Sequence, residues 1–131
     1  MPELAPGLRG ETSLVVRPEN TAAAMGSGNA NVFATPEMVR LMEEAAVAAL
    51  RGHLPPGSTS VGIELQVKHL AATPVGLSVA VTAELVEVSG RILTFRVQAR
   101  DPVELVGDGI HRRAIVVASR FEQKADRKSV V

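Results

Sequence analysis

The chain has 131 residues, 14 basic against 14 acidic side chains and no Cys, so it fits one domain without disulfides, thiolate metal sites or Cys nucleophiles. Balanced charge and the absence of Trp and Tyr argue against nucleic acid or an anionic lipid surface as a partner. No stretch has the length of a membrane span or a signal peptide core, so we expect a cytoplasmic domain over residues 1–131 that makes no membrane contact.

The first third of the chain predicts a short strand, a loop and a long helix. Residues 1–11 are expected to be a loose start, and residues 12–16 are a strand candidate. Residues 17–31 are small and polar without a clear period, which indicates a mobile, lid-like loop. A helix is expected over 36–51, with Thr35 as its N-cap and Gly52 beyond its end. Its apolar stripe, at 100° per residue, comprises Met38, Leu41, Met42, Ala45, Ala46, Ala49 and Leu50.

After the helix the hydrophobic period changes to two, which is typical of strands. A turn is expected at 73–76, a hairpin at Ser89-Gly90, and a bulge near 107–109. Residues 123–131 are expected to be a loose tail. The predicted strands cover 61–69, 77–88, 91–100 and 103–121.

This order of elements predicts an α+β fold. A single helix with one apolar stripe must bury that stripe, and the sheet is the only large partner available. We therefore expect one long helix on one antiparallel sheet of about five strands. An open sheet leaves two edges, and pairing of one edge with a second copy would produce a homodimer.

Three side chains are candidates for chemistry, each with a structural alternative. Glu43 borders the apolar stripe of the helix, where a carboxylate either serves a function or extends its charge to solvent. His69 ends an inward-facing series of strand residues, as a core residue or as a general acid or base. Thr35 is an N-cap, a site hydroxyl, or both. The three His residues have no metal-ligand spacing, and no phosphate-binding or serine-hydrolase motif occurs.

Three segments resemble the fluoroacetyl-CoA thioesterase-like branch of the hot-dog superfamily. They are VFATPEMVRLMEEAA (32–46), SVGIELQVKHLAATPVGLSVAVTAEL (60–85) and GDGIHRRAIV (107–116), so the likeness covers roughly 32–120. It implies a hot-dog fold, a helix wrapped by a curved sheet, and a homodimer. It also implies hydrolysis of a small acyl-CoA to free acid and CoA without a metal or cofactor. The implied catalytic residues are Thr35, Glu43 and His69, and the implied substrate-binding residues are Gly62 and Arg113.

Two features depart from this family pattern. The lid segment 17–31 lacks the large aromatic residues of the best-known member, so we expect a different or broader acyl group than fluoroacetyl. Strict alternation along the strand places Gly62 on the face opposite His69, and a bend, a bulge or a second subunit would have to bring both to one site. Lys68, Arg112, Arg113 and Arg120 could meet the phosphates of CoA or could be solvated. The alternative functions are a non-catalytic acyl-CoA binder and a hot-dog enoyl-CoA hydratase.

Overall fold

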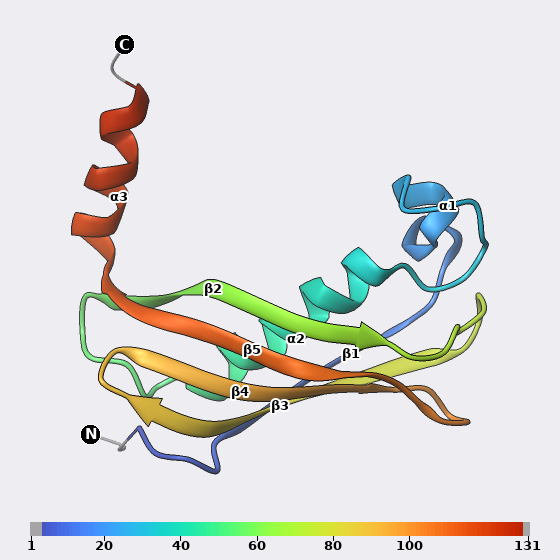
Figure 1. Cartoon of the computed structure of the whole chain (residues 1–131), viewed down its shortest axis with the longest axis horizontal. Coiled ribbons are helices and arrows are strands. Elements are labelled where there is room, and N and C mark those ends of the chain that lie inside the picture. Colours follow the sequence, from blue (N-terminus) through green and yellow to red (C-terminus); the bar gives the residue numbers. More distant parts are fainter. Residues whose placement is uncertain (1–3, 130–131) are drawn as a thin grey trace.

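The computed structural model describes residues 4–129 and contains, in that range, a five-stranded antiparallel sheet and one long helix (Figure 1). The predicted α+β architecture is therefore confirmed. The strands are β1 (Arg9–Val15), β2 (Ser58–His69), β3 (Ser78–Ser89), β4 (Ile92–Arg100) and β5 (Leu105–Val117). The helices are α1 (Ala22–Met25), α2 (Thr35–Leu50) and α3 (Ala118–Asp126), with 3-10 turns at Pro18–Asn20 and Arg127–Ser129.

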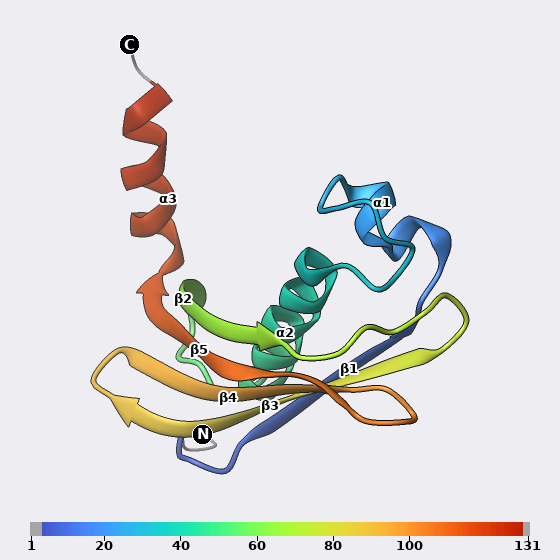
Figure 2. The same ribbon diagram turned by 45° about the vertical axis from the view of Figure 1, so that its right-hand side comes forward.

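The sheet has the strand order β1-β3-β4-β5-β2, and every neighbouring pair is antiparallel. It curves around α2, which lies along one face (Figure 2). The edges are β1 and the longer β2. At the two ends of β2, α1 and α3 project from the body of the molecule (Figures 1 and 2).

The core lies between α2 and the strands β3 and β4. All seven residues of the predicted helix stripe are buried. The alternating positions of the two central strands are buried with them, which confirms both period assignments. These strand positions are Val79, Val81, Ala83 and Leu85 on β3, and Leu93, Phe95, Val97 and Ala99 on β4.

A bulge in β2 decides which of its residues face the helix. Gly62 pairs with Arg113 and Glu64 with Arg112, so Ile63 is an extra residue with no partner position on β5. The alternation shifts by one at this point, and Gly62 therefore lies on the same face as His69. This bulge resolves the conflict that strict alternation predicts between the two residues. The β4–β5 ladder is also irregular beside Gly107, as predicted.

Helix α2 lies close to β1 at Gly10. A Cβ atom at this position would overlap the backbone of Ala45 and Ala49. We predict that Gly10→Ala lowers the free energy of unfolding by about 1–3 kcal/mol, the usual cost of overpacking a core. Urea denaturation would measure this loss, with Ser13→Ala on the exposed side of β1 as the control. Equal stability of Gly10→Ala and the wild type would contradict this close approach.

The predicted boundaries differ most from the structure near the two ends of the chain. Strand β1 begins at Arg9, inside the segment 1–11 that was expected to be loose. Strand β5 ends at Val117, and α3 replaces both the last residues of the predicted strand 103–121 and most of the tail. Apolar residues at Val117, Phe121 and Ala125 recur every four positions, which favours a helix. Residues 1–3 and 130–131 of the expected tails lie outside the described range.

The segment 17–31 has more regular structure than expected, because it holds a 3-10 turn and α1. The Thr21 hydroxyl accepts a hydrogen bond from the Ala24 amide at 3.2 Å and caps α1. Gly26 ends this helix with a φ of 72°, in the left-handed region that glycine tolerates. No helix within residues 4–129 is long and apolar enough to cross a membrane.

Candidate active site

The start of α2 and the end of β2 bring Thr35 and His69 together. Thr35 Oγ1 lies 2.7 Å from His69 Nδ1. The predicted N-cap role of Thr35 was wrong: the helix begins at Thr35 itself, and the N-cap position is Ala34. Its hydroxyl is therefore available to the imidazole. A hydrogen bond of 2.8 Å from the Phe33 amide to the Thr73 carbonyl fixes the chain before α2 against the loop after β2.

His69 is half-buried in a cleft of about 350 Å³. The ring of Phe33 meets the imidazole edge to face, with centroids 6.1 Å apart. Nε2 is buried and has no hydrogen-bond partner among the described residues. Burial lowers the pKa of His69, and a backbone contact with Ala71 opposes this shift. The imidazole is therefore neutral near pH 7 and can act as an acid or a base. The cleft is lined by Ala22, Ser27, Val32, Phe33, Thr35, His69, Leu70, Ala71 and Ala72.

Glu43 lies in a second cluster, with Gly62 and Arg113, which we call the Glu43 cluster. Its Oε2 is 3.7 Å from Arg113 Nη1, and 44% of its side chain is exposed. A Cβ atom on Gly62 would lie 2.9 Å from this Oε2, so only glycine leaves the carboxylate its present position. Burial lowers the pKa of Arg113, and Glu43 opposes the shift, so the guanidinium stays charged.

Within one chain, these two groups of residues are separate. Thr35 and Glu43 are eight residues apart on one helix, which corresponds to about 12 Å along its axis. The cleft beside Glu43, of about 540 Å³, shares no lining residue with the cleft beside His69, in the part of the chain that the structure describes. The structure thus joins Thr35 with His69, and Glu43 with Gly62 and Arg113.

The remaining basic candidates lie away from both clefts. Arg112 bonds to the Glu64 carboxylate at 3.0 Å on the outer face of the sheet. Lys68 is exposed on β2, and Arg120 is exposed on α3. Of the four, only Arg113 lines one of these two clefts. Within residues 4–129, no group of three or more His, Asp or Glu side chains is arranged to hold a metal ion.

Sequence reasoning missed His111, which is fully buried next to Arg113. It lies two positions before Arg113 on β5, so period-two alternation places both side chains on one face. A more complete use of that alternation could have identified it.

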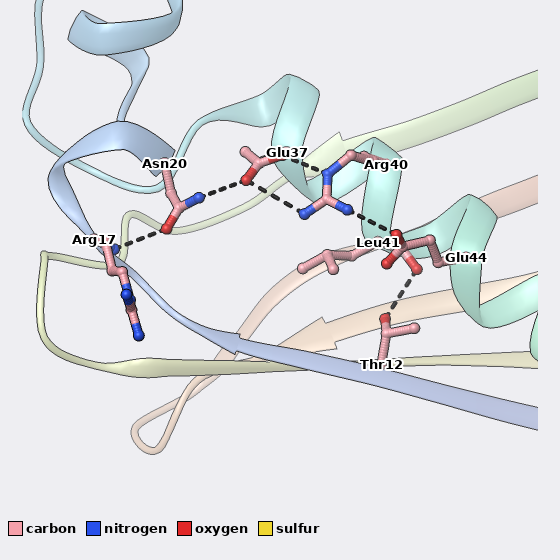
Figure 3. A network of polar contacts seen from close by, with 7 residues as sticks. All are labelled: Thr12, Arg17, Asn20, Glu37, Arg40, Leu41 and Glu44. Carbon is pink, nitrogen blue, oxygen red and sulfur yellow. Dashed lines mark hydrogen bonds and ion pairs between the residues drawn. The ribbon is translucent and has the colours of Figure 1, made fainter.

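A polar network ties the lid-like segment to the start of α2 (Figure 3). The Asn20 amide donates to Glu37 at 2.6 Å, and Arg40 donates to Glu37 and Glu44, both at 2.7 Å. Glu37 is only 7% exposed, and its carboxylate is bonded to both Asn20 and Arg40. The Arg40 hydrogen bond lowers the pKa of Glu37 against the effect of burial. The network thereby holds segment 17–31 beside the helix turn that carries Thr35.

The half-buried His69 and the buried His111 predict a loss of stability in mild acid. Burial lowers the pKa of both His69 and His111 below the ordinary value of 6.5. Between the folded and unfolded pKa values the unfolded chain binds more protons, so their stabilisation is present above about pH 6.5 and is lost as the pH falls through the folded values. Urea denaturation between pH 8 and pH 5 should show this decline. The double variant His69→Gln/His111→Gln should flatten it, whereas an equally steep decline in that variant would assign the effect to other groups.

A curved antiparallel sheet wrapped around one long helix is the hot-dog fold of the thioesterase superfamily. A Thermus thermophilus hypothetical protein, described as a thioesterase superfamily member, has this fold with a TM-score of 0.90 and 27% identity, over 98% of this chain and 96% of that one.

The match is closer to one family within this class. The family described as fluoroacetyl-CoA-specific thioesterase matches residues 16–119, and the chain belongs to it. The fluoroacetyl-CoA thioesterase of Streptantibioticus cattleyicolor is 49% identical over 98 residues, 75% of this chain and 70% of the relative. A crystal structure of the fluoroacetyl-CoA thioesterase has a TM-score of 0.89 and 41% identity, over 97% of this chain and 98% of that one.

Proposed function

We propose that this protein hydrolyses a small acyl-CoA thioester to the free acid and CoA. The observation that carries the proposal is the 2.7 Å contact between the Thr35 hydroxyl and the His69 imidazole, in a cleft open to a ligand. Membership of a thioesterase family supports the reaction class.

The proposed reaction needs one nucleophile, one proton donor and one group that stabilises negative charge. Glu43 either removes a proton from the water that attacks the thioester carbonyl, or attacks the carbonyl itself to form an anhydride that water then hydrolyses to the free acid. The N-terminus of α2 offers backbone N–H groups to the resulting oxyanion. Collapse of the tetrahedral intermediate breaks the C–S bond, and His69, which is neutral at rest, passes to the CoA thiolate the proton that the attacking water releases. Thr35 holds the imidazole in place or serves as the acceptor hydroxyl. Each of these groups belongs to the chain, so the proposal includes no cofactor.

Such a reaction requires Glu43 to meet the Thr35–His69 pair, and we infer that a homodimer brings them together. Strand β2 is a long sheet edge, where Ile63 is 51% exposed and Leu65 is 36% exposed. An exposed apolar edge of this kind is a template for pairing with another strand. A second copy, related by a two-fold axis, would extend the sheet across β2.

The residues of β2 support one register for this pairing. With the two-fold axis at Gln66, Leu65 pairs with the partner's Val67, so apolar side chains meet on the helix side. On the outer side Glu64 pairs with the partner's Lys68, which places opposite charges face to face. Beyond these pairs, the bulge at Ile63 brings Gly62 opposite the partner's His69. Directly paired residues of an antiparallel ladder lie about 4.5–5.5 Å apart at Cα. The Glu43 carboxylate, which lies over Gly62, would therefore face the partner's Thr35–His69 pair.

The walls of the proposed site suggest a broader acyl group than fluoroacetyl. The His69 cleft is lined mainly by small side chains, and Met25 of α1 is the only large apolar residue within the segment 17–31. Few large groups would therefore cover the acyl chain.

The expected cytoplasmic location also belongs to this proposal, and imaging of the full-length protein in cells would test it.

A hydrolysis screen tests the proposed function. The panel comprises short, branched, aromatic and halogenated acyl-CoAs, with released thiol as the readout and Glu43→Gln as the inactive reference. Turnover of at least one member by the wild type alone is the expected result. Binding without turnover over the whole panel would indicate an acyl-CoA binder. Hydration of an enoyl-CoA without any hydrolysis would indicate a hydratase.

A further inference from the structure

The buried imidazole of His111 is the polar group next to the Glu43 cluster to which the proposed reaction assigns no role. It is 0% exposed, and its ring stacks on Phe95 with centroids 6.4 Å apart and 29° between the planes. A Cβ atom on Gly62 would lie 3.2 Å from its Cε1. His111 thus forms the floor beneath the position where Glu43 meets Gly62.

The hydrogen bonds of His111 identify its tautomer. Nδ1 lies 2.9 Å from the Glu64 carbonyl, which can only accept, so Nδ1 carries the proton and donates. Nε2 lies 3.1 Å from Arg113 Nη1, which can only donate, so Nε2 accepts. A ring that donates at one nitrogen and accepts at the other is neutral. The β2 bulge is adjacent to Glu64 and disrupts the hydrogen-bond ladder there, at the carbonyl to which the imidazole donates.

Arg113 is held at all three of its guanidinium nitrogens. Nε donates to Ser60 Oγ at 2.8 Å, and Nη2 donates to the Ser60 carbonyl at 3.0 Å. Nη1 donates to His111, and the same Nη1 lies 3.7 Å from Glu43 Oε2. His111 therefore holds the nitrogen that approaches the proposed catalytic carboxylate.

We propose that neutral His111 is a positioning residue that directs Arg113 toward Glu43 and the substrate, and that its protonation in acid releases Arg113. A proton on Nε2 would remove the acceptor and place two cations in contact. The groups that face the ring are Arg113 on β5, Glu43 on α2 and Phe95 on β4. On β2, the Glu64 backbone carbonyl accepts from the ring, whereas the Glu64 carboxylate is bonded to Arg112.

Burial, the largest effect, and the charge of Arg113 both lower the pKa of His111. The Glu64 carbonyl and Glu43 act in the opposite direction. The neutral form therefore prevails near pH 7, as the proposal requires. The catalytic part of this inference depends on the proposed thioesterase activity, whereas the placement of Arg113 does not.

The kinetic test is a double-mutant cycle on the acyl-CoA that the screen shows to be hydrolysed fastest. We expect His111→Phe to lower kcat/KM by about 10- to 100-fold, which corresponds to losing a hydrogen bond to a charged group. In a chain that already carries Arg113→Gln, the same change should have almost no further effect, because His111 acts through Arg113. Independent, multiplicative losses would overturn the proposal. Val97→Ala, a core change on β4 away from Arg113, is the control that lowers stability while keeping kcat/KM.

A conservative variant and a spectroscopic readout complete the test. Gln at position 111 can donate to Glu64 and accept from Arg113, so His111→Gln should keep kcat/KM within a few-fold and move the acid limb of the pH profile to lower pH. In 15N NMR spectra, the Arg113 Nη1–H signals should exchange about 10-fold or more faster with solvent in His111→Phe than in the wild type, because His111 accepts from Nη1. This readout needs no turnover and therefore separates a failure of this inference from a failure of the proposed function. An unchanged exchange rate would overturn the inference.

Discussion

Glu43→Gln is expected to lower kcat at least about 100-fold, the usual size of a lost general base. Gln keeps the shape of the side chain but can neither attack a carbonyl nor remove a proton from water. Stability should change little, because 44% of the Glu43 side chain is exposed and its contact with Arg113, at 3.7 Å, is long. Initial rates of CoA release, together with a thermal unfolding curve, measure both quantities.

The adjacent residue supplies a matched control. Glu44 lies on the same helix, loses the same charge on substitution and pairs with Arg40 on the exposed face, so Glu44→Gln should keep the wild-type rate. His69→Asn should match the loss in Glu43→Gln, with the half-buried His53 replaced by Asn as its control. Wild-type rates in either Glu43→Gln or His69→Asn would remove that residue from the catalytic set.

Mixing the two inactive variants is expected to restore activity. If each site combines Glu43 of one subunit with Thr35 and His69 of its partner, a mixed dimer of Glu43→Gln and His69→Asn chains contains one intact site. Random exchange makes half of the dimers mixed, so about one quarter of the wild-type activity should return. A site contained within one chain predicts no recovery, because no subunit of any dimer would then be intact.

The control for subunit mixing is a double variant, with Glu43→Gln and His69→Asn on the same chain. If each site combines residues of two subunits, both sites of its mixed dimer with the wild type lack one catalytic residue. If each site lies within one chain, the same mixed dimer keeps the intact site of the wild-type subunit. Random mixing in equal amounts should thus retain about one quarter of the wild-type activity in the first case and about half in the second. Lys68→Glu should weaken dimerisation, measured by sedimentation, because it faces Glu64 in the proposed register.

The hydrophobic pattern along the chain was sufficient to predict which face of a single helix or strand is buried. The helix stripe from Met38 to Leu50 and the alternation along β3 and β4 were predicted correctly, since burial on one face repeats with the period of the backbone. The boundaries were less reliable. Gly10 appears as a flexible residue in sequence, but in the structure it belongs to a strand that α2 approaches closely.

The candidate site required more than local pattern. The resemblance to a family singled out Thr35, Glu43 and His69, but no spacing along the chain reveals the hydrogen bond between Thr35 and His69. That contact forms because the loops before α2 and after β2 bind each other. Alternation along β5 could have placed His111 on the same face as Arg113, but it gives no sign of the hydrogen bonds that Glu64 and Arg113 form with the ring.

The sequence by itself determined the fold class and the faces that form the core, and it indicated the candidate catalytic residues. Side-chain type and hydrophobic period are local properties, so they can be read along the chain. Only the tertiary structure decided that Gly62 shares a face with His69 and that Arg113 donates a hydrogen bond to His111. It also decided that Glu43 lies in a different cleft from Thr35. These arrangements depend on one extra residue in β2 and on contacts between segments distant in the chain. Such contacts form only when the whole sheet closes around its helix.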